Sequence, residues 1–293
     1  MRDRADIPTD EAIRSILRHF DVQPSGLLGH GGEAWVFALD DQHVLRVLRD
    51  TQACRHINER QALVDELAQA GAPFALPKVV RCDSLNDRSF AVEHRLPGKA
   101  VGQQLHRLGR SDRNRLVEHH LDAANALGDL HLDERGWYGD LLAPTPVRRA
   151  TWRRYLTEKA ADGLRRAPGF ENIEPDTLAA DLPDADGGQF VHLDAFTGNM
   201  LSIDTTITAV IDIGATSIRG DRRLDPLSAA VYLCAPHITP AADEHDRRTA
   251  KAWLTNAGLI DHFEPARRWL AAFWAWATDD QELHHWCREV LLH

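Results

Sequence analysis

The sequence predicts an α+β fold of two lobes, an N-terminal antiparallel sheet with helices and a larger, mainly helical C-terminal lobe. The first hundred residues alternate β-branched, strand-like runs with two helical stretches, and after them the pattern is mainly helical. Between these regions lies the segment LPGKAVG at 96–102, with one proline and two glycines. Such residues interrupt regular structure, so we expect lobes over residues 1–97 and 98–293.

The N-terminal lobe is expected to contain, in chain order, a helix, two strands, a helix and two strands. Residues 8–20 form an amphipathic pattern with Thr9 or Asp10 as the N-cap. The runs AWVFAL and HVLRVL, separated by polar residues, predict a hairpin. Residues 52–70 predict a helix that ends at Gly71, and two further strands follow in LPKVVRCD and RSFAVEHRL.

The C-terminal lobe is expected to contain five helices, near residues 111–131, 151–166, 226–235, 243–257 and 264–290. Residues 168–189 are acidic and rich in proline and glycine, which predicts a surface connection around one short helix. Five tryptophans fall on the late helices and are most simply core residues: Trp253, Trp269, Trp274, Trp276 and Trp286.

Composition indicates a soluble, cytoplasmic protein. The chain has 293 residues, enough for two lobes with cores of their own, and no apolar run as long as a membrane span. Its N-terminus, MRDRADIPTDEA, carries charges where a signal peptide would be apolar. Its four cysteines lie far apart without a CxxC pair, which indicates reduced thiols and no zinc site built from cysteines.

The formal net charge of −10 argues against a nucleic-acid partner, because binding to phosphates requires clustered Lys and Arg. An acidic enzyme would tolerate or attract a positively charged small molecule. Solubility alone also accounts for an acidic surface, and on charge alone that is the simpler explanation.

The most informative stretch is FVHLDAFTGNMLSIDTTITAVIDIG at 190–214, which holds the pattern H-x-D-x-x-x-x-N and a later aspartate. Phosphoryl transfer needs a base beside the attacking hydroxyl and ligands for the Mg²⁺ on the nucleotide phosphates. We expect Asp194 to be the base, and Asn199 and Asp212, separated by a predicted hairpin, to be the magnesium ligands. His192 is expected to support the loop structurally.

A glycine loop precedes the first hairpin, in Gly29-His30-Gly31-Gly32-Glu33-Ala34. Backbone N–H groups of such a loop can approach nucleotide phosphates closely, so Gly29, Gly31 and Gly32 are candidate nucleotide-binding residues. Taken alone, an ordinary glycine turn explains this segment equally well. The hairpin and the loop at 192–199 favour the interpretation as a nucleotide-binding loop.

A strand cation is expected to bind the nucleotide phosphates and to pair with a glutamate on the following helix. The strand HVLRVLR has no lysine, and Arg46 takes this place, with Arg49 as the alternative. Its partner would be Glu59, with Glu66 on the same helix face as the alternative. Each of these residues could equally be an exposed surface group.

With these motifs in place, the chain resembles the aminoglycoside phosphotransferase family, the small-molecule branch of the protein-kinase-like fold. The resemblance rests on LLGHGGEAWVFAL, HVLRVLR, FAVEHRLPGKAVG, LGDLHLDERGWYGDLL, VHLDAFTGNML and VIDIGATSIRGDRRLDPL, and it covers most of the chain. It implies a bilobal protein-kinase-like fold whose N-terminal lobe binds the nucleotide and whose C-terminal lobe binds the acceptor. The chain departs from the family at Leu193, where relatives have glycine.

The resemblance also implies residue roles. The backbone of Glu93, His94 and Arg95 would meet the adenine, and Asp225 would brace the catalytic loop. The cofactors would be ATP, with GTP as the alternative, and Mg²⁺.

The function expected is transfer of the γ-phosphate to a hydroxyl of a cationic antibiotic, giving resistance or self-protection. A kinase for choline, homoserine or a sugar is the alternative within the enzyme class. A pseudokinase scaffold is the alternative outside it, supported only by Arg46 and Leu193. Only twelve residues separate Asp212 from Asp225, too few for the activation loop of a protein kinase.

Overall fold

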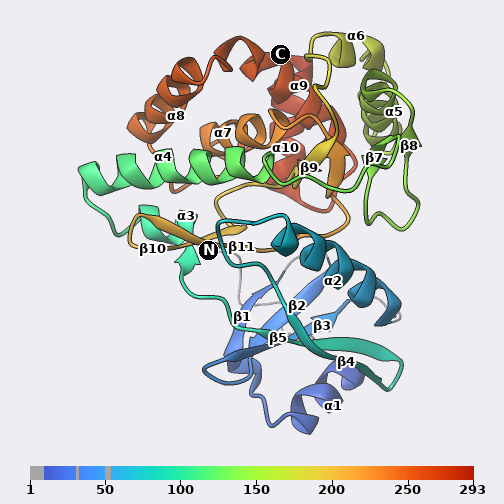
Figure 1. Ribbon diagram of the computed structural model, residues 1–293, viewed down its shortest axis with the longest axis vertical. Coiled ribbons are helices and arrows are strands. Elements are labelled where there is room, and N and C mark those ends of the chain that lie inside the picture. Colours follow the sequence, from blue (N-terminus) through green and yellow to red (C-terminus); the bar gives the residue numbers. More distant parts are fainter. Residues whose placement is uncertain (1–9, 31–32, 50–53) are drawn as a thin grey trace. The chain divides into compact units, whose positions relative to one another are not determined.

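The computed structural model describes residues 10–30, 33–49 and 54–293, and the chain folds into two compact units. The first comprises Met1–Glu66 and Leu76–Leu96, and the second comprises Leu67–Ala75 and Pro97–His293. The predicted combination of an N-terminal antiparallel sheet and a mainly helical remainder is confirmed (Figure 1). The nucleotide and acceptor roles of the two lobes stay predictions.

The first unit is a five-stranded antiparallel sheet in the order β1-β2-β3-β5-β4. Its elements are α1 (Glu11–His19), β1 (Leu27–His30), β2 (Ala34–Ala38), β3 (His43–Leu48), α2 (Cys54–Gln69), β4 (Val79–Leu85) and β5 (Arg88–His94). The hairpins 34–48 and 79–94 and both helices follow the sequence prediction. The strand β1 was not predicted, because its four residues include Gly29 and show no alternation.

Alternate residues of β3 face two different cores, as the pleat of a strand requires. Leu45 and Val47 pack with Ile13 and Ile16 of α1, whereas Leu48 packs with Ile57 of α2. Asp10 is the N-cap of α1 and accepts a hydrogen bond from Ala12 N at 2.8 Å, as one of the two expected caps. The other expected cap, Thr9, lies outside the described residues.

The second unit contains a helical core and two small sheets, β11-β10-β6 and β8-β7-β12-β9. Its helices are α3 (Val101–Leu105), α4 (Arg110–Leu127), α5 (Trp152–Arg165), α6 (Pro175–Ala180), α7 (Leu224–Cys234), α8 (Glu244–Asn256), α9 (Phe263–Trp274) and α10 (Gln281–Leu292). Its strands are β6 (Lys99–Ala100), β7 (Tyr138–Asp140), β8 (Arg148–Arg149), β9 (Gln189–Val191), β10 (Met200–Ile203), β11 (Thr206–Val210) and β12 (Ile218–Gly220).

Within this unit α7 is nearly enclosed, since it packs against α4, α8 and α9 (Figure 1). Of the predicted core tryptophans, Trp269 and Trp286 are buried, and Trp253, Trp274 and Trp276 are half-buried. The prediction of one helix over 264–290 is wrong, because residues 275–280 separate α9 from α10. Asp280 starts α10 by accepting a hydrogen bond from Leu283 N at 3.1 Å.

The connection into the second unit requires glycine at position 98, where φ is +112°. A Cβ there would lie 2.8 Å from the Ser202 carbonyl oxygen of β10, so no larger side chain fits. Among the residues that the structure describes, no helix is both long and apolar enough to cross a membrane.

Candidate active site

The loop with the H-x-D-x-x-x-x-N pattern runs from His192 to Asn199, between β9 and β10. Asp225, in the first turn of α7, accepts hydrogen bonds from two consecutive backbone N–H groups of the loop. Its Oδ2 accepts from His192 N and its Oδ1 from Leu193 N, both at 2.8 Å. The expected bracing role of Asp225 is therefore confirmed.

Leu193 lies in the left-handed region at φ +65°, with its side chain fully buried. Its carbonyl accepts a hydrogen bond from Tyr232 Oη at 3.0 Å, and Trp274 Nε1 donates to the same hydroxyl at 2.7 Å. A leucine in this conformation is strained, so the surrounding contacts must hold the backbone there. The position at which the resemblance implies glycine is thus one where glycine is favoured physically.

Asp194 and Asn199 are joined directly. Asn199 Nδ2 donates to the Asp194 carbonyl at 3.0 Å and to Asp194 Oδ2 at 2.9 Å, while Asn199 is buried and Asp194 half-buried. These bonds use the amide nitrogen, so Asn199 Oδ1 is left as an acceptor that does not bond Asp194. An oxygen of this kind is a ligand that Mg²⁺ prefers.

Asp212 follows the predicted hairpin, which the structure confirms as the antiparallel pair β10 and β11. Ile211 N donates to the Asn199 carbonyl at 2.9 Å, so the backbone places position 212 next to Asn199. Asp212 is half-buried and takes a left-handed conformation, with φ +63°. The register of the hairpin thus brings both expected magnesium ligands to one end of it.

His192 is buried, and its Nε2 lies 2.9 Å from the Ile211 carbonyl. Burial lowers the pKa of His192, which favours the neutral ring with its proton on Nε2. The ring therefore ties the loop to the residue before Asp212. This geometry supports the expected structural role and offers no contact that would make His192 a base.

The glycine loop of the first unit is described only in part. Gly29 belongs to β1 and lies opposite Val36 of β2 in the sheet register. Gly31 and Gly32, the other two expected phosphate-binding glycines, lie outside the described residues.

Arg46 is buried on β3, and its Nη2 donates to Glu33 Oε2 at 3.2 Å. The expected partner Glu59 is exposed on α2 and accepts from Arg55 Nε at 2.8 Å. The reason is the phase of the helix. Ile57 and Arg60, one turn apart, lie on the buried face of α2, and Glu59 does not. The geometry therefore favours Glu33 over Glu59 as the partner of Arg46.

One charged α2 residue that does reach the sheet is Arg60, which sequence reasoning missed. Arg60 Nη2 forms an ion pair with Glu93 Oε1 of β5, and both side chains are buried. The side chain of Glu93 thus anchors α2, while the expected contact of its backbone with the adenine stays a prediction. The only signal for this pair in the sequence was that Arg60 and Glu93 are charged residues of opposite sign at positions where the helix and the strand would be buried.

The expected adenine contacts stay a prediction, and the structure shows which backbone N–H groups of the next two residues are already in use. His94 N donates to the Lys78 carbonyl at 2.9 Å, and Arg95 N donates to the Gln42 carbonyl at 2.7 Å. Both N–H groups are thus used inside the first unit. Among the described residues, no backbone hydrogen bond outside the helices and strands uses the N–H of Leu96.

Tyr232 is another residue in contact with this loop that the sequence did not reveal. It lies seven residues after Asp225 on α7, hence on the same helix face, and both side chains bond Leu193. That spacing was the available signal. Trp274, interpreted as a core residue, is the donor that orients the Tyr232 hydroxyl.

A family model described as phosphotransferase enzyme family matches residues 27–253 of the chain. No curated protein matches the chain in sequence. Among solved structures, the GDP complex of wild-type aminoglycoside 2'-phosphotransferase-IIIa matches with a TM-score of 0.63 at 15% identity, covering 97% of this chain and 98% of that one.

Two further solved structures agree with this match. The gentamicin complex of APH(2'')-IIa has a TM-score of 0.59 at 16% identity, covering 97% of this chain and 96% of its own. The ADP-bound aminoglycoside phosphotransferase APH(2'')-Ib has a TM-score of 0.58 at 15% identity, covering 97% of both chains. At these identities the likeness concerns the fold.

Proposed function

The chain belongs to the phosphotransferase enzyme family, and we propose that it transfers the γ-phosphate of a nucleotide to a hydroxyl of a small cationic antibiotic. The observation that carries the proposal is the pair formed by Asp194 and Asn199. The amide nitrogen of Asn199 fixes the Asp194 carboxylate, and the amide oxygen Oδ1 points away from it. A base and a magnesium ligand would thereby be held in one rigid loop.

In this mechanism Asp194 orients the acceptor hydroxyl and takes its proton as the oxygen attacks the γ-phosphorus. The bond from that phosphorus to the bridging β–γ oxygen breaks, and the nucleoside diphosphate leaves. Asn199 Oδ1 and the Asp212 carboxylate would hold Mg²⁺, which would neutralise charge on the phosphate oxygens. Both are hard oxygen donors at the same end of the β10–β11 hairpin, so the residues present fit this ion.

Nucleotide binding is assigned to the first unit. Arg46 would bind phosphate oxygens through its guanidinium, which is held beside the glycine loop by Glu33. The backbone around Glu93, His94 and Arg95 would meet the adenine, and the N–H of Leu96 would serve as a donor there. The GDP and ADP complexes of the structural neighbours leave both ATP and GTP as cofactor candidates.

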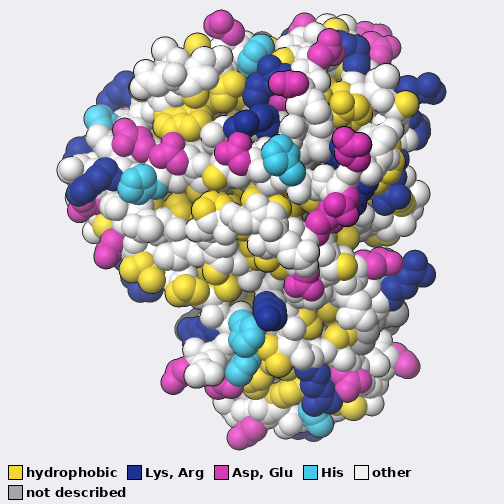
Figure 2. Space-filling model, viewed as in Figure 1, with side chains coloured by type: hydrophobic (Ala, Val, Ile, Leu, Met, Phe, Trp, Pro, Cys, Tyr) yellow, Lys and Arg dark blue, Asp and Glu magenta, His cyan; other side chains and the backbone are white. Residues whose placement is uncertain are grey.

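A cationic acceptor is supported by the net charge of −10 and by the gentamicin and kanamycin bound to two structural neighbours. Figure 2 shows acidic and basic side chains interspersed on the visible face of the second unit, so the net charge is not one large patch there. Selectivity for a cation would therefore come from a few carboxylates close to Asp194. A neutral acceptor held by hydrogen bonds and aromatic rings is the competing possibility.

The deciding experiment incubates the protein with Mg²⁺, labelled ATP or GTP, and a panel of antibiotics and metabolites, choline, homoserine and sugars included. Mass spectrometry should show an aminoglycoside that gains one phosphate, and the Asp194→Asn variant should form this product more slowly by about a hundredfold or more. If a neutral metabolite alone gains phosphate, the antibiotic assignment is wrong. Nucleotide binding without any turnover would support the pseudokinase alternative.

A further inference from the structure

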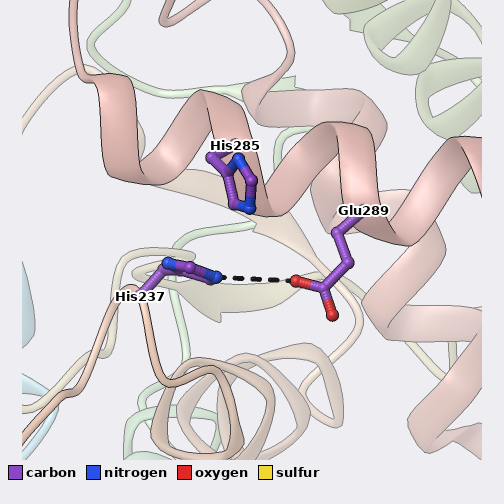
Figure 3. A group of neighbouring side chains, drawn as sticks. All are labelled: His237, His285 and Glu289. Carbon is purple, nitrogen blue, oxygen red and sulfur yellow. Dashed lines mark ion pairs between the residues drawn. The ribbon is translucent and has the colours of Figure 1, made fainter.

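Three metal-ligating side chains meet far from the catalytic loop in sequence, on the surface of the second unit. His285 and Glu289 project from one face of α10, four residues apart, and His237 comes from the segment that follows α7. One ligand atom from each lies within 4.8 Å of the other two (Figure 3). Figure 3 shows the three side chains pointing toward one another.

We propose that His237, His285 and Glu289 form a binding site for a borderline divalent transition-metal ion such as Zn²⁺. Two imidazoles and one carboxylate are a ligand set typical of Zn²⁺, with water completing a tetrahedron. Bonds of about 2.0 Å place tetrahedral ligand atoms about 3.3 Å apart. His237 Nε2 and Glu289 Oε2 already lie 3.6 Å apart, so small side-chain rotations complete the geometry.

A fourth residue prepares His237 for this role. His237 Nδ1 lies 3.0 Å from Glu282 Oε2, three residues before His285 on the same face of α10. Donation from Nδ1 to this carboxylate fixes the tautomer, so the lone pair of Nε2 points to the other two ligands. Carboxylates placed behind ligating histidines orient them in the same way in established metal sites.

The site differs from the proposed magnesium site in chemistry and in access. Imidazole nitrogens select transition metals, whereas Mg²⁺ prefers oxygens and keeps its water. The side chains of His237 and Glu289 are 33% and 52% exposed, so an ion can enter from solvent without opening the fold. The ion would join the end of α7, the helix that carries Asp225 and Tyr232, to α10.

The consequence of binding would be local stabilisation. Trp286, the residue after His285, makes an edge contact with Tyr232 at a centroid distance of 6.3 Å. A metal bridge from His237 to α10 would therefore hold together the two elements around Tyr232. A bound ion that prefers the folded state raises the melting temperature, and the rise grows with the logarithm of the free ion concentration once this exceeds the dissociation constant.

The test is calorimetric titration of the untagged protein with Zn²⁺, in excess Mg²⁺ and without nucleotide, together with thermal melting. We expect about one equivalent to bind and the melting temperature to rise. His285→Ala and Glu289→Gln should each weaken Zn²⁺ binding by about tenfold or more, and Glu282→Gln by about tenfold. Asp212→Asn, which alters the proposed magnesium site, should leave the stoichiometry and the affinity of Zn²⁺ binding unchanged.

His131→Ala is the matched control, because His131 is exposed in the same unit and belongs to no such cluster among the described residues. It should bind Zn²⁺ as the wild type does. The proposal is overturned if the wild type binds no Zn²⁺, or if His285→Ala and Glu289→Gln bind it unchanged. In that case His237 only pairs with Glu282 and Glu289 and contacts the ring of His285 across α10 and the loop at 237.

Discussion

Asn199 donates its side-chain amide to both the backbone carbonyl and the carboxylate of Asp194, at 3.0 and 2.9 Å. Because the two residues lie at opposite ends of a short loop, these bonds fix the carboxylate relative to the β10–β11 hairpin. The same amide leaves Oδ1 available as an acceptor. Asn199 thus positions the proposed base and can also ligate a metal. A substitution of Asn199 would therefore alter both functions at once, so each is tested at another residue.

The first prediction concerns the base. Asp194→Asn keeps an acceptor for Asn199 but cannot take a proton, so kcat should fall roughly a hundredfold or more with nucleotide affinity nearly unchanged. Steady-state kinetics and nucleotide titration measure both. Asp204→Asn, at the exposed turn between β10 and β11, is the control and should keep normal turnover. Near-normal turnover in Asp194→Asn would show that another group takes the proton.

The second prediction concerns the metal. Asp212→Asn suits the left-handed backbone at φ +63° and removes the negative charge, so it tests ligation without a conformational penalty. The affinity for Mg²⁺ in the presence of nucleotide should fall by about tenfold or more, and activity should fall with it. Calorimetry at several Mg²⁺ concentrations measures the first effect. An unchanged magnesium dependence would place the ion on other residues.

The third prediction separates Arg46 from its alternative, Arg49. Arg46→Ala should lower both nucleotide affinity and kcat, and Arg46→Lys should keep part of the activity because a point charge still reaches phosphate. Arg49 stacks its guanidinium over Trp35, 4.4 Å from the ring centroid, so Arg49→Ala is the matched control. We expect it to retain nucleotide affinity. The reverse ranking of the two alanine variants would make Arg49 the phosphate-binding cation.

The fold was predictable from the sequence where order is local. Caps, glycine stops and alternating runs predicted α1, α2 and the two hairpins of the first unit, and the hairpin between Asn199 and Asp212. The sheet β8-β7-β12-β9 escaped prediction because its strands have two or three residues and pair across long stretches of chain. The alternation of apolar and polar residues that predicts a strand can be recognised only in segments longer than these.

The site was predictable where chemistry depends on spacing along the chain. The loop was predicted from its spacing and the bracing aspartate from the family resemblance, whereas the partners of Arg46 and Glu93 depend on helix phase and sheet register. An error of one residue in phase exchanges Glu59 for Arg60 at the face of α2 that meets the sheet. Likewise, only the folded chain shows that neighbouring carbonyls already occupy the N–H groups of His94 and Arg95.

The fourth prediction uses the strained backbone at Leu193. Both Leu193→Gly and Leu193→Ala lose most of a fully buried side chain, at about 2–5 kcal/mol. At φ +65° glycine relieves strain that alanine keeps, so the glycine variant should be more stable than the alanine variant by about 1 kcal/mol. Elsewhere the order is usually the opposite. Urea unfolding midpoints decide this, and an alanine variant as stable as the glycine variant would contradict it.

The fifth prediction concerns the pH dependence of stability. Burial raises the pKa of Asp225 from 3.8 to about 7, while the hydrogen bonds from His192 and Leu193 oppose this shift. The folded state therefore binds a proton more readily than the unfolded state between about pH 4 and 7. Stability contributed by this group is fully present below pH 4 and is lost as the pH rises through 7.

Asp225→Asn removes the titrating group, so the stability of the wild type relative to this variant should decrease from pH 4.5 to 7. The slope approaches at most about 1.4 kcal/mol per pH unit, and above pH 7 the difference should stay constant. Urea unfolding of both proteins across this range measures it. Asp243→Asn is the control, because the pKa of Asp243 is lowered to about 2, mainly by the Asp246 N–H, and it stays charged throughout. If the relative stability of the wild type instead stayed constant or rose with pH, the two N–H bonds would outweigh burial and Asp225 would be a carboxylate in this range.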